Sequence, residues 1–182
     1  PIYTSTDNII AAMTTRTNKV HAGGGAGLNL EGNGFVIGIW DGGSTLTTHE
    51  QLVGRVTVLD GSTLNDHATH VGGTLIGDGI GTGSNAANAK GMAPQSNLNS
   101  YDFVGDTGEM GPFSMTGLIS NHSYGNVAGW RYAPQQTPNW QWFGLTANLI
   151  PGGEDPKFGK YDSKAVEWDI LANVNPYYLI VK

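Results

Sequence analysis

The chain has 182 residues, of which 38% are hydrophobic and 13% charged, a composition typical of one folded domain rather than of a disordered segment. Its formal net charge is −6 and its nine Lys and Arg residues are scattered, so it lacks the basic patch that a nucleic-acid partner requires. The absence of cysteine and of any apolar run of transmembrane length argues against disulfides, thiolate metal sites and a membrane partner.

Hydrophobic patterning predicts strands that alternate with helices. The apolar run 35–40 does not alternate with polar residues, which predicts a strand buried on both faces. Residues 66–76 have apolar side chains four positions apart, which predicts a helix capped by Asn65 or Asp66. The expected helices cover residues 9–20 (after a cap at Asp7 or Asn8), 66–76 and 163–173, and the expected strands cover residues 35–40, 97–103, 118–123 and 177–181.

This order predicts an α/β fold, namely a parallel sheet flanked by helices, with functional residues at the carboxyl ends of its strands. Residues 1–182 are expected to belong to a single domain. Within it, residues 128–160 are rich in Trp, Pro and Gly without a clear period, which predicts a long, partly packed loop. We therefore expect an insertion around residues 127–161, where Trp130, Trp140, Trp142 and Phe143 line the binding cleft or pack within the insertion.

Two residues at the ends of predicted elements carry the chemistry. Asp41 directly follows the buried strand, where a carboxylate sits at the carboxyl edge of the sheet, and His67 opens the next helix. Taken singly, an Asp before glycine is typical of a turn and a histidine at a helix start is typical of a structural residue. Taken together, a strand that ends in Asp-Gly and a helix that opens with His-x-Thr-His-Val-x-Gly-Thr form a far more specific pattern.

Four sequence blocks resemble, in the same order, those of the subtilisin-like serine proteases. VIGIWDGG is similar to the Asp block of that family and HATHVGGT to its His block, while GMAPQSNL and NHSYG are similar to two later blocks. The resemblance covers residues 34–125, and the last predicted helix and strand also fit it. It implies a subtilisin-like α/β fold and an endopeptidase that hydrolyses peptide bonds with an Asp-His-Ser triad.

The resemblance also implies roles for individual residues. His67 would be the general base, and Asp41 would hold its tautomer and stabilise the imidazolium. Ser123, Tyr124 and Gly125 match the segment whose backbone pairs with an extended polypeptide substrate. The chemistry requires no cofactor. Because members of the family are typically secreted, and an acidic chain without cysteine suits a bacterial member, the resemblance also implies a secreted bacterial protein.

The nucleophile is missing from this sequence. No serine lies in the Gly-Thr-Ser-Met-Ala context of the family, and the block that carries its oxyanion Asn would begin directly after Lys182. We therefore expect this chain to be the N-terminal part of a catalytic domain, incomplete and inactive alone. A complementary C-terminal fragment or a downstream segment would supply Ser and Asn.

Two other functions remain open. His67, His70 and Asp41 could form a hydrolytic metal site, although the spacing lacks the His-Glu-x-x-His pattern. The chain could instead be an inactive peptide-binding fragment or pseudoprotease. Under the protease interpretation, His70 is a structural residue beneath the site.

Structural calcium is a further expectation, because subtilisin-like proteins often bind it in loops. Asp78, Asn85 and Asn88 offer hard oxygen ligands in a Gly- and Asn-rich stretch, although their spacing matches no specific calcium motif.

Overall fold

A computed structural model describes residues 8–81, 86–137, 139–145 and 155–182 of the chain. The chain divides into two compact units. The first comprises Pro1–Tyr124 together with Leu171–Lys182 and contains a five-stranded sheet; the second comprises Gly125–Ile170 and contains a two-stranded sheet.

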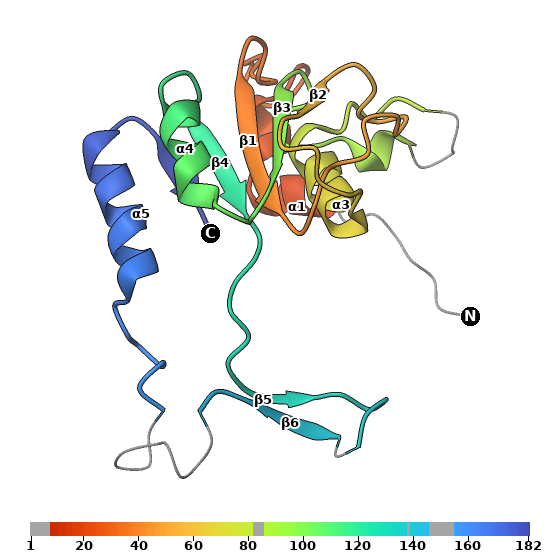
Figure 1. Cartoon of the computed structure of the whole chain (residues 1–182). Coiled ribbons are helices and arrows are strands. Elements are labelled where there is room, and N and C mark those ends of the chain that lie inside the picture. Colours follow the sequence, from red (N-terminus) through yellow and green to blue (C-terminus); the bar gives the residue numbers. More distant parts are fainter. Residues whose placement is uncertain (1–7, 82–85, 138, 146–154) are drawn as a thin grey trace. The chain divides into compact units, whose positions relative to one another are not determined.

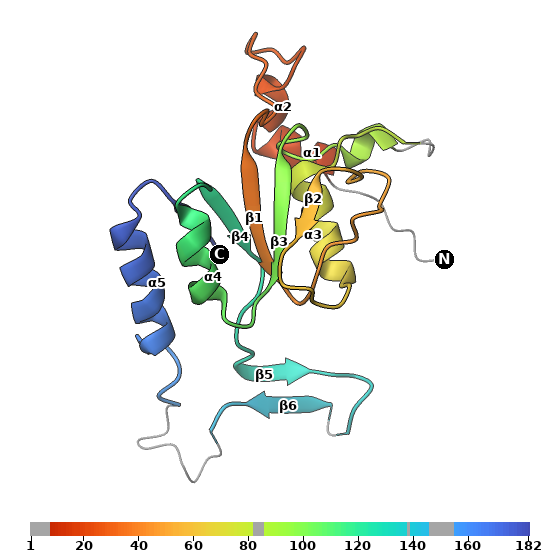
Figure 2. The ribbon, with the colours of Figure 1, turned by 45° about the horizontal axis from the view of Figure 1, so that its top comes forward.

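The five-stranded sheet is parallel and has β1 (Val36–Asp41) at its centre (Figures 1 and 2). Its strand order is β2-β3-β1-β4-β7, and all four pairings between neighbours are parallel. The other strands are β2 (Val56–Val58), β3 (Asn97–Asp102), β4 (Ile119–His122) and β7 (Leu179–Val181). The prediction of a parallel sheet flanked by helices is therefore confirmed.

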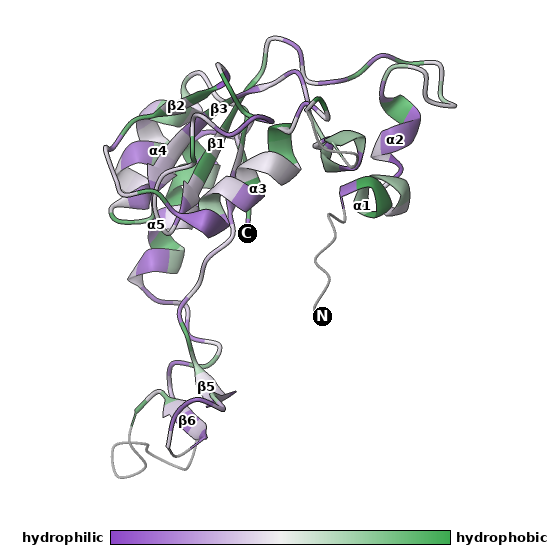
Figure 3. Ribbon diagram, turned by 90° about the vertical axis from the view of Figure 1, so that its right-hand side faces the viewer, coloured by the Kyte–Doolittle hydropathy of each residue, from purple (hydrophilic) through white to green (hydrophobic). Residues whose placement is uncertain are grey.

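Each face of the sheet is covered by a different kind of side chain. Ile37 and Ile39 of β1 belong to an aliphatic cluster, and residues of α3 (Asp66–Ile76) pack against it. Trp40 points to the opposite face, where it meets α4 (Asp106–Ser114). Figure 3 shows the hydrophobic strands between these two helices. Burial on both faces explains why β1 is apolar without alternation.

On the α4 face, three rings from neighbouring strands stack at one level of the sheet. Trp40 is paired in register with Tyr101 of β3 and His122 of β4. Its ring is parallel to both, with centroids 4.3 Å from Tyr101 and 5.1 Å from His122, and Phe113 of α4 meets it edge-on at 5.5 Å. Space for the indole comes from Gly38, where an added Cβ would lie 2.5 Å from the Trp40 ring.

The helix predicted over residues 66–76 is confirmed, with Asn65 as its cap: the Asn65 side chain accepts a hydrogen bond from the backbone of Ala68. The helix predicted over 9–20 is wrong as a single element, because Arg16 adopts a left-handed conformation with φ of 65°. It separates α1 (Asn8–Thr14) from α2 (Thr17–Val20). The alternative cap Asp7 lies outside the described residues.

Hydrophobic patterning did not predict α4 or β2. Gly108, Gly111 and Pro112 lie inside α4 and disfavour a helix by local propensity, so its stability comes from packing. Met110 and Phe113 of α4 are buried, 0% and 5% exposed. β2 has only three residues and lies at the edge of the sheet, too short for a periodic signal.

The second unit contains an antiparallel hairpin of β5 (Gly129–Tyr132) and β6 (Trp140–Phe143), so the prediction of a loop here was wrong. Cross-strand aromatic pairs hold it: Trp130 with Trp142 at 5.5 Å and Tyr132 with Trp140 at 5.1 Å between ring centroids. The remaining helical segments are η1 (Ala86–Ala89) and α5 (Ser163–Val174), and α5 confirms the last predicted helix.

The helices of the described ranges are short. α5, with 12 residues, is the longest of them, and none has both the length and the apolar character needed to cross a membrane.

The packing around Trp40 predicts a large cost for filling Gly38. Gly38→Ala should lower the free energy of unfolding by about 2–3 kcal/mol, because the methyl group would overlap the rings of Trp40 and Phe113. Gly111→Ala is the matched control: an added Cβ there meets nothing within 4 Å, and alanine favours the helix by up to about 1 kcal/mol. Urea unfolding of both variants measures this, and equal effects would contradict the packing argument.

Candidate active site

Asp41 and His67 are joined by a hydrogen bond at the carboxyl end of β1. His67 Nδ1 lies 2.7 Å from Asp41 Oδ1 and 2.9 Å from Oδ2. Asp41 also accepts a hydrogen bond of 2.7 Å from the backbone N–H of Gly42. Its carboxylate is almost fully buried, whereas 56% of the His67 side chain is exposed. A buried acceptor thus holds one nitrogen of an otherwise accessible imidazole.

Asn65 connects the two elements that carry this pair. Its side chain caps α3 two residues before His67 and also donates to the carbonyl of Gly42, 3.3 Å away. Its backbone N–H donates to the carbonyl of Ser44 over 2.9 Å. The loop that follows Asp41 and the first turn of α3 are therefore fixed to each other, which sets the distance between carboxylate and imidazole.

The hydrogen bond to Asp41 decides which nitrogen of His67 is the base. A carboxylate only accepts hydrogen bonds, so Nδ1 carries the proton and Nε2 holds the lone pair. No serine hydroxyl within the described ranges hydrogen-bonds to His67. The dyad can therefore accept a proton from a group that reaches Nε2, but the described residues do not supply that group.

The predicted substrate segment continues β4 beyond its last paired residue. β4 pairs with β1 up to His122, and Ser123, Tyr124 and Gly125 follow without regular secondary structure. Ser123 is exposed and its hydroxyl accepts a hydrogen bond of 2.9 Å from Asn121. Among the described residues, no partner hydrogen-bonds to the backbone of Ser123, Tyr124 or Gly125. Tyr124 closes the first unit and Gly125 opens the second.

A buried chain of polar side chains, which the sequence analysis missed, runs up β4 to this segment. Ser120 Oγ lies 2.8 Å from His122 Nε2, and His122 Nδ1 lies 3.0 Å from the hydroxyl of Tyr124. Tyr124 donates to Asp106 of α4 over 2.6 Å, and Tyr178 donates to Ser120 over 2.5 Å. The sequence feature that could have revealed this chain is the spacing of Ser, His and Tyr at positions 120, 122 and 124, in and directly after a predicted strand, because alternate residues of a strand share a face.

Ser120 and His122 look like a nucleophile and its base, but they cannot serve as one. Ser120 is 0% and His122 1% exposed, so no peptide carbonyl can reach the hydroxyl. Burial, helped by the nearby Lys182 ammonium, lowers the pKa of His122 to about 4, although Asp106 opposes this. Burial and the hydrogen bond to Asp106 raise the pKa of Tyr124. Both groups are therefore neutral around pH 7.

Acidic side chains gather near the carboxyl edge of the sheet. Glu109 of α4 accepts a hydrogen bond of 2.9 Å from the indole of Trp40, which favours its charged form. Burial raises the pKa of Glu109 nevertheless, and the carboxylates of Asp60, Asp102 and Asp106 raise it further. Four carboxyl groups thus crowd this edge of the sheet, and their mutual repulsion disfavours charge on Glu109.

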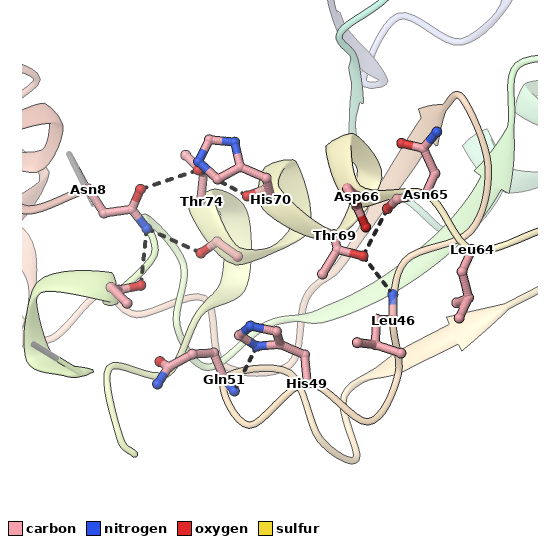
Figure 4. A pocket seen from close by; sticks show the side chains of 12 residues that line it. Asn8, Leu46, His49, Gln51, Leu64, Asn65, Asp66, Thr69, His70 and Thr74 are labelled. Carbon is pink, nitrogen blue, oxygen red and sulfur yellow. Dashed lines mark hydrogen bonds between the residues drawn. The ribbon is translucent and has the colours of Figure 1, made fainter. Parts of the chain in front are cut away.

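His70 does not lie beneath the dyad, so that expectation was wrong. It is exposed rather than buried, and it lines a pocket of about 390 Å³ whose lining residues do not include His67 or Asp41. Figure 4 shows His70 beside Thr74, whose hydroxyl donates to Asn8. His67, His70 and Asp41, all within the described ranges, do not form a group of three metal ligands.

The calcium expectation finds no assembled site. Asn85 lies outside the described residues, and Asn88 belongs to η1. Asp78 accepts a hydrogen bond of 2.8 Å from the backbone of Ile80 and faces Arg55 at 4.0 Å, so a cationic side chain already compensates its charge. Three or more acidic or histidine side chains do not converge on a metal position in the described ranges, and we assign no calcium there.

Comparison with known proteins gives no match: no protein family matches this sequence, and no curated protein does either.

The lowered pKa of His122 predicts a loss of stability in mild acid. The unfolded chain protonates this histidine near pH 6.5 and the folded chain near 4, so the unfolded state binds more protons between these values. The free energy of unfolding should then fall by on the order of 2 kcal/mol as the pH decreases from 7 to 4.

His122→Asn should remove this part of the pH dependence, whereas His70→Asn, which changes an exposed histidine, should retain it. Urea unfolding at several pH values measures the difference. The same pH dependence in wild type and His122→Asn would contradict the assignment.

Proposed function

We propose that this chain carries the Asp-His part of a subtilisin-like serine endopeptidase. The observation that carries the proposal is the geometry of Asp41 and His67: a buried carboxylate 2.7 Å from Nδ1 of an exposed imidazole, at the carboxyl edge of a parallel sheet. A serine hydroxyl is a weak nucleophile, and this arrangement is what its activation requires.

In the proposed reaction, His67 Nε2 takes the proton of a serine hydroxyl as its oxygen attacks the carbonyl carbon of a peptide bond. The imidazolium then gives that proton to the leaving amine as the carbon–nitrogen bond breaks, and water hydrolyses the resulting acyl-enzyme. Asp41 keeps Nδ1 protonated and stabilises the transient positive charge. Its burial strengthens this interaction, because little solvent screens the carboxylate.

The substrate in this proposal is an extended polypeptide bound to Ser123, Tyr124 and Gly125. The backbone of this segment continues a parallel strand and makes no hydrogen bond to other described residues. A peptide can pair with it as an added strand, which provides main-chain hydrogen bonds whatever the side chains are.

The serine and the oxyanion-binding Asn come, in this proposal, from a complementary or downstream segment. β7 supports this because it is the last strand in the order of the sheet, with its outer edge unpaired among the described residues. Leu179 and Val181 of β7 are 59% and 43% exposed. A parallel strand is normally covered on both faces, so a further segment beside β7 would bury this surface.

The test is activity of the chain together with the segment that supplies the serine. Hydrolysis of casein and labelling by a fluorophosphonate probe should both be observed. Asp41→Asn should lower kcat by about 10³–10⁴-fold, because His67 loses the partner that fixes its tautomer. His67→Ala should lower it at least as far.

His70→Ala is the matched control and should keep kcat within about threefold, since this exposed residue lines a pocket that includes neither Asp41 nor His67. Loss of activity in His70→Ala, or on treatment with a chelator, would favour the metal-dependent alternative instead. Peptide binding without hydrolysis or labelling in the wild-type complex would identify an inactive peptide-binding protein.

A further inference from the structure

The polar chain along β4 has a defined direction. Ser120, His122 and Tyr124 lie two residues apart, so their side chains share the face of the sheet that α4 covers. At one end is the hydroxyl of Tyr178, 5% exposed, and at the other the carboxylate of Asp106, 0% exposed. Each junction is 2.5–3.0 Å long, within hydrogen-bonding distance.

The carboxylate fixes every proton in this chain. Asp106 only accepts, so the hydroxyl of Tyr124 donates to it, and the Tyr124 oxygen accepts from His122 Nδ1–H. In the neutral imidazole Nε2 is then an acceptor, and it takes the proton of Ser120. The hydroxyl of Tyr178 donates to Ser120 in turn. All donors therefore point toward Asp106, and such aligned hydrogen bonds strengthen one another.

This arrangement holds the ring of Tyr124 in one position. Its hydroxyl is bound from two sides, by Asp106 on α4 and His122 on β4. The ring lies 5.2 Å from that of Phe103, centroid to centroid, and Lys182 Nζ lies 4.1 Å from its centroid. Phe103 follows β3 directly, and its backbone N–H donates to the carbonyl of Asp41 over 2.9 Å. The backbone of Phe103 therefore lies beside Asp41, and the Tyr124 ring contacts the Phe103 ring at the carboxyl edge of the sheet.

We propose that Asp106 and His122 are positioning residues of the candidate site: they hold Tyr124, and thereby set the affinity of the Ser123–Gly125 segment for an extended peptide. The proposal rests on the function proposed above and adds two residues to it. Neither residue touches the reacting atoms, so they act on substrate binding and leave proton transfer by His67 unchanged. The two are buried on the opposite face of the sheet from Asp41, and both hydrogen-bond to the Tyr124 hydroxyl, the contact that links them to the Ser123–Gly125 segment.

The experiment compares Tyr124→Phe, Asp106→Asn and the control Tyr177→Phe in the complex of the chain with its serine-bearing segment. Tyr177 is 88% exposed, so its hydroxyl has no part in this network. For a fluorogenic casein peptide, Tyr124→Phe and Asp106→Asn should raise KM about tenfold and change kcat less than about threefold. Tyr177→Phe should change neither constant.

A second measurement does not depend on activity. Long-range ¹H–¹⁵N correlation spectra of the labelled chain should show His122 as the Nδ1–H tautomer at pH 7, and Tyr124→Phe should shift its imidazole signals. Because Tyr124→Phe can also lower stability, Asp106→Asn provides a second variant, which retains the tyrosine hydroxyl and removes only its anionic acceptor.

The outcomes separate the two proposals. If the wild-type complex hydrolyses the peptide but Tyr124→Phe and Asp106→Asn leave KM unchanged, the positioning role is overturned and the protease proposal remains intact. A fall in kcat at constant KM also overturns it, since that result places the effect on the chemical step. A wild-type complex that neither binds nor hydrolyses the peptide overturns the proposed function, and the positioning role with it.

Discussion

Trp40 and Asp41 are neighbours in β1, and because successive side chains of a strand point to opposite faces, they lie on opposite sides of the sheet. Trp40 enters the aromatic layer under α4, where it stacks between rings of the two adjacent strands. Asp41 turns toward α3 and meets His67. A shift of β1 by one residue would exchange these positions, so the register of this strand fixes the core and the candidate site together.

The candidate site depends on burial as much as on distance. Asp41 keeps its carboxylate out of solvent while His67 remains open to it, so the carboxylate acts on the imidazole with little screening. Asn65 makes this geometry reproducible, because one side chain both caps α3 and bonds the loop after Asp41. A general base of this kind needs a fixed tautomer, and the hydrogen bond to Asp41 provides it.

The two faces of the sheet contribute differently to the proposed enzyme. The α3 face carries the Asp41–His67 dyad, which would perform proton transfer. The α4 face carries the polar chain that ends at Asp106 and binds the hydroxyl of Tyr124, the middle residue of the proposed substrate segment. Both converge at the carboxyl edge because all the strands of this sheet are parallel, which is also where ligands bind in α/β folds in general.

The sequence by itself determined the features that depend on neighbouring residues. An apolar run located β1, coarser patterning predicted strands at β3 and β4, and periodicity with a capping residue located α3; Asp41 became a candidate only together with the His67 block. The sequence could not locate α4, whose glycines and proline oppose a helix, or the hairpin of the second unit, whose Pro- and Gly-rich surroundings show no clear period. Only the tertiary structure decided that His67 meets Asp41 while His70 faces elsewhere, and that Asp106 reaches Tyr124. Such contacts follow from the packing of whole elements, which local propensity does not encode.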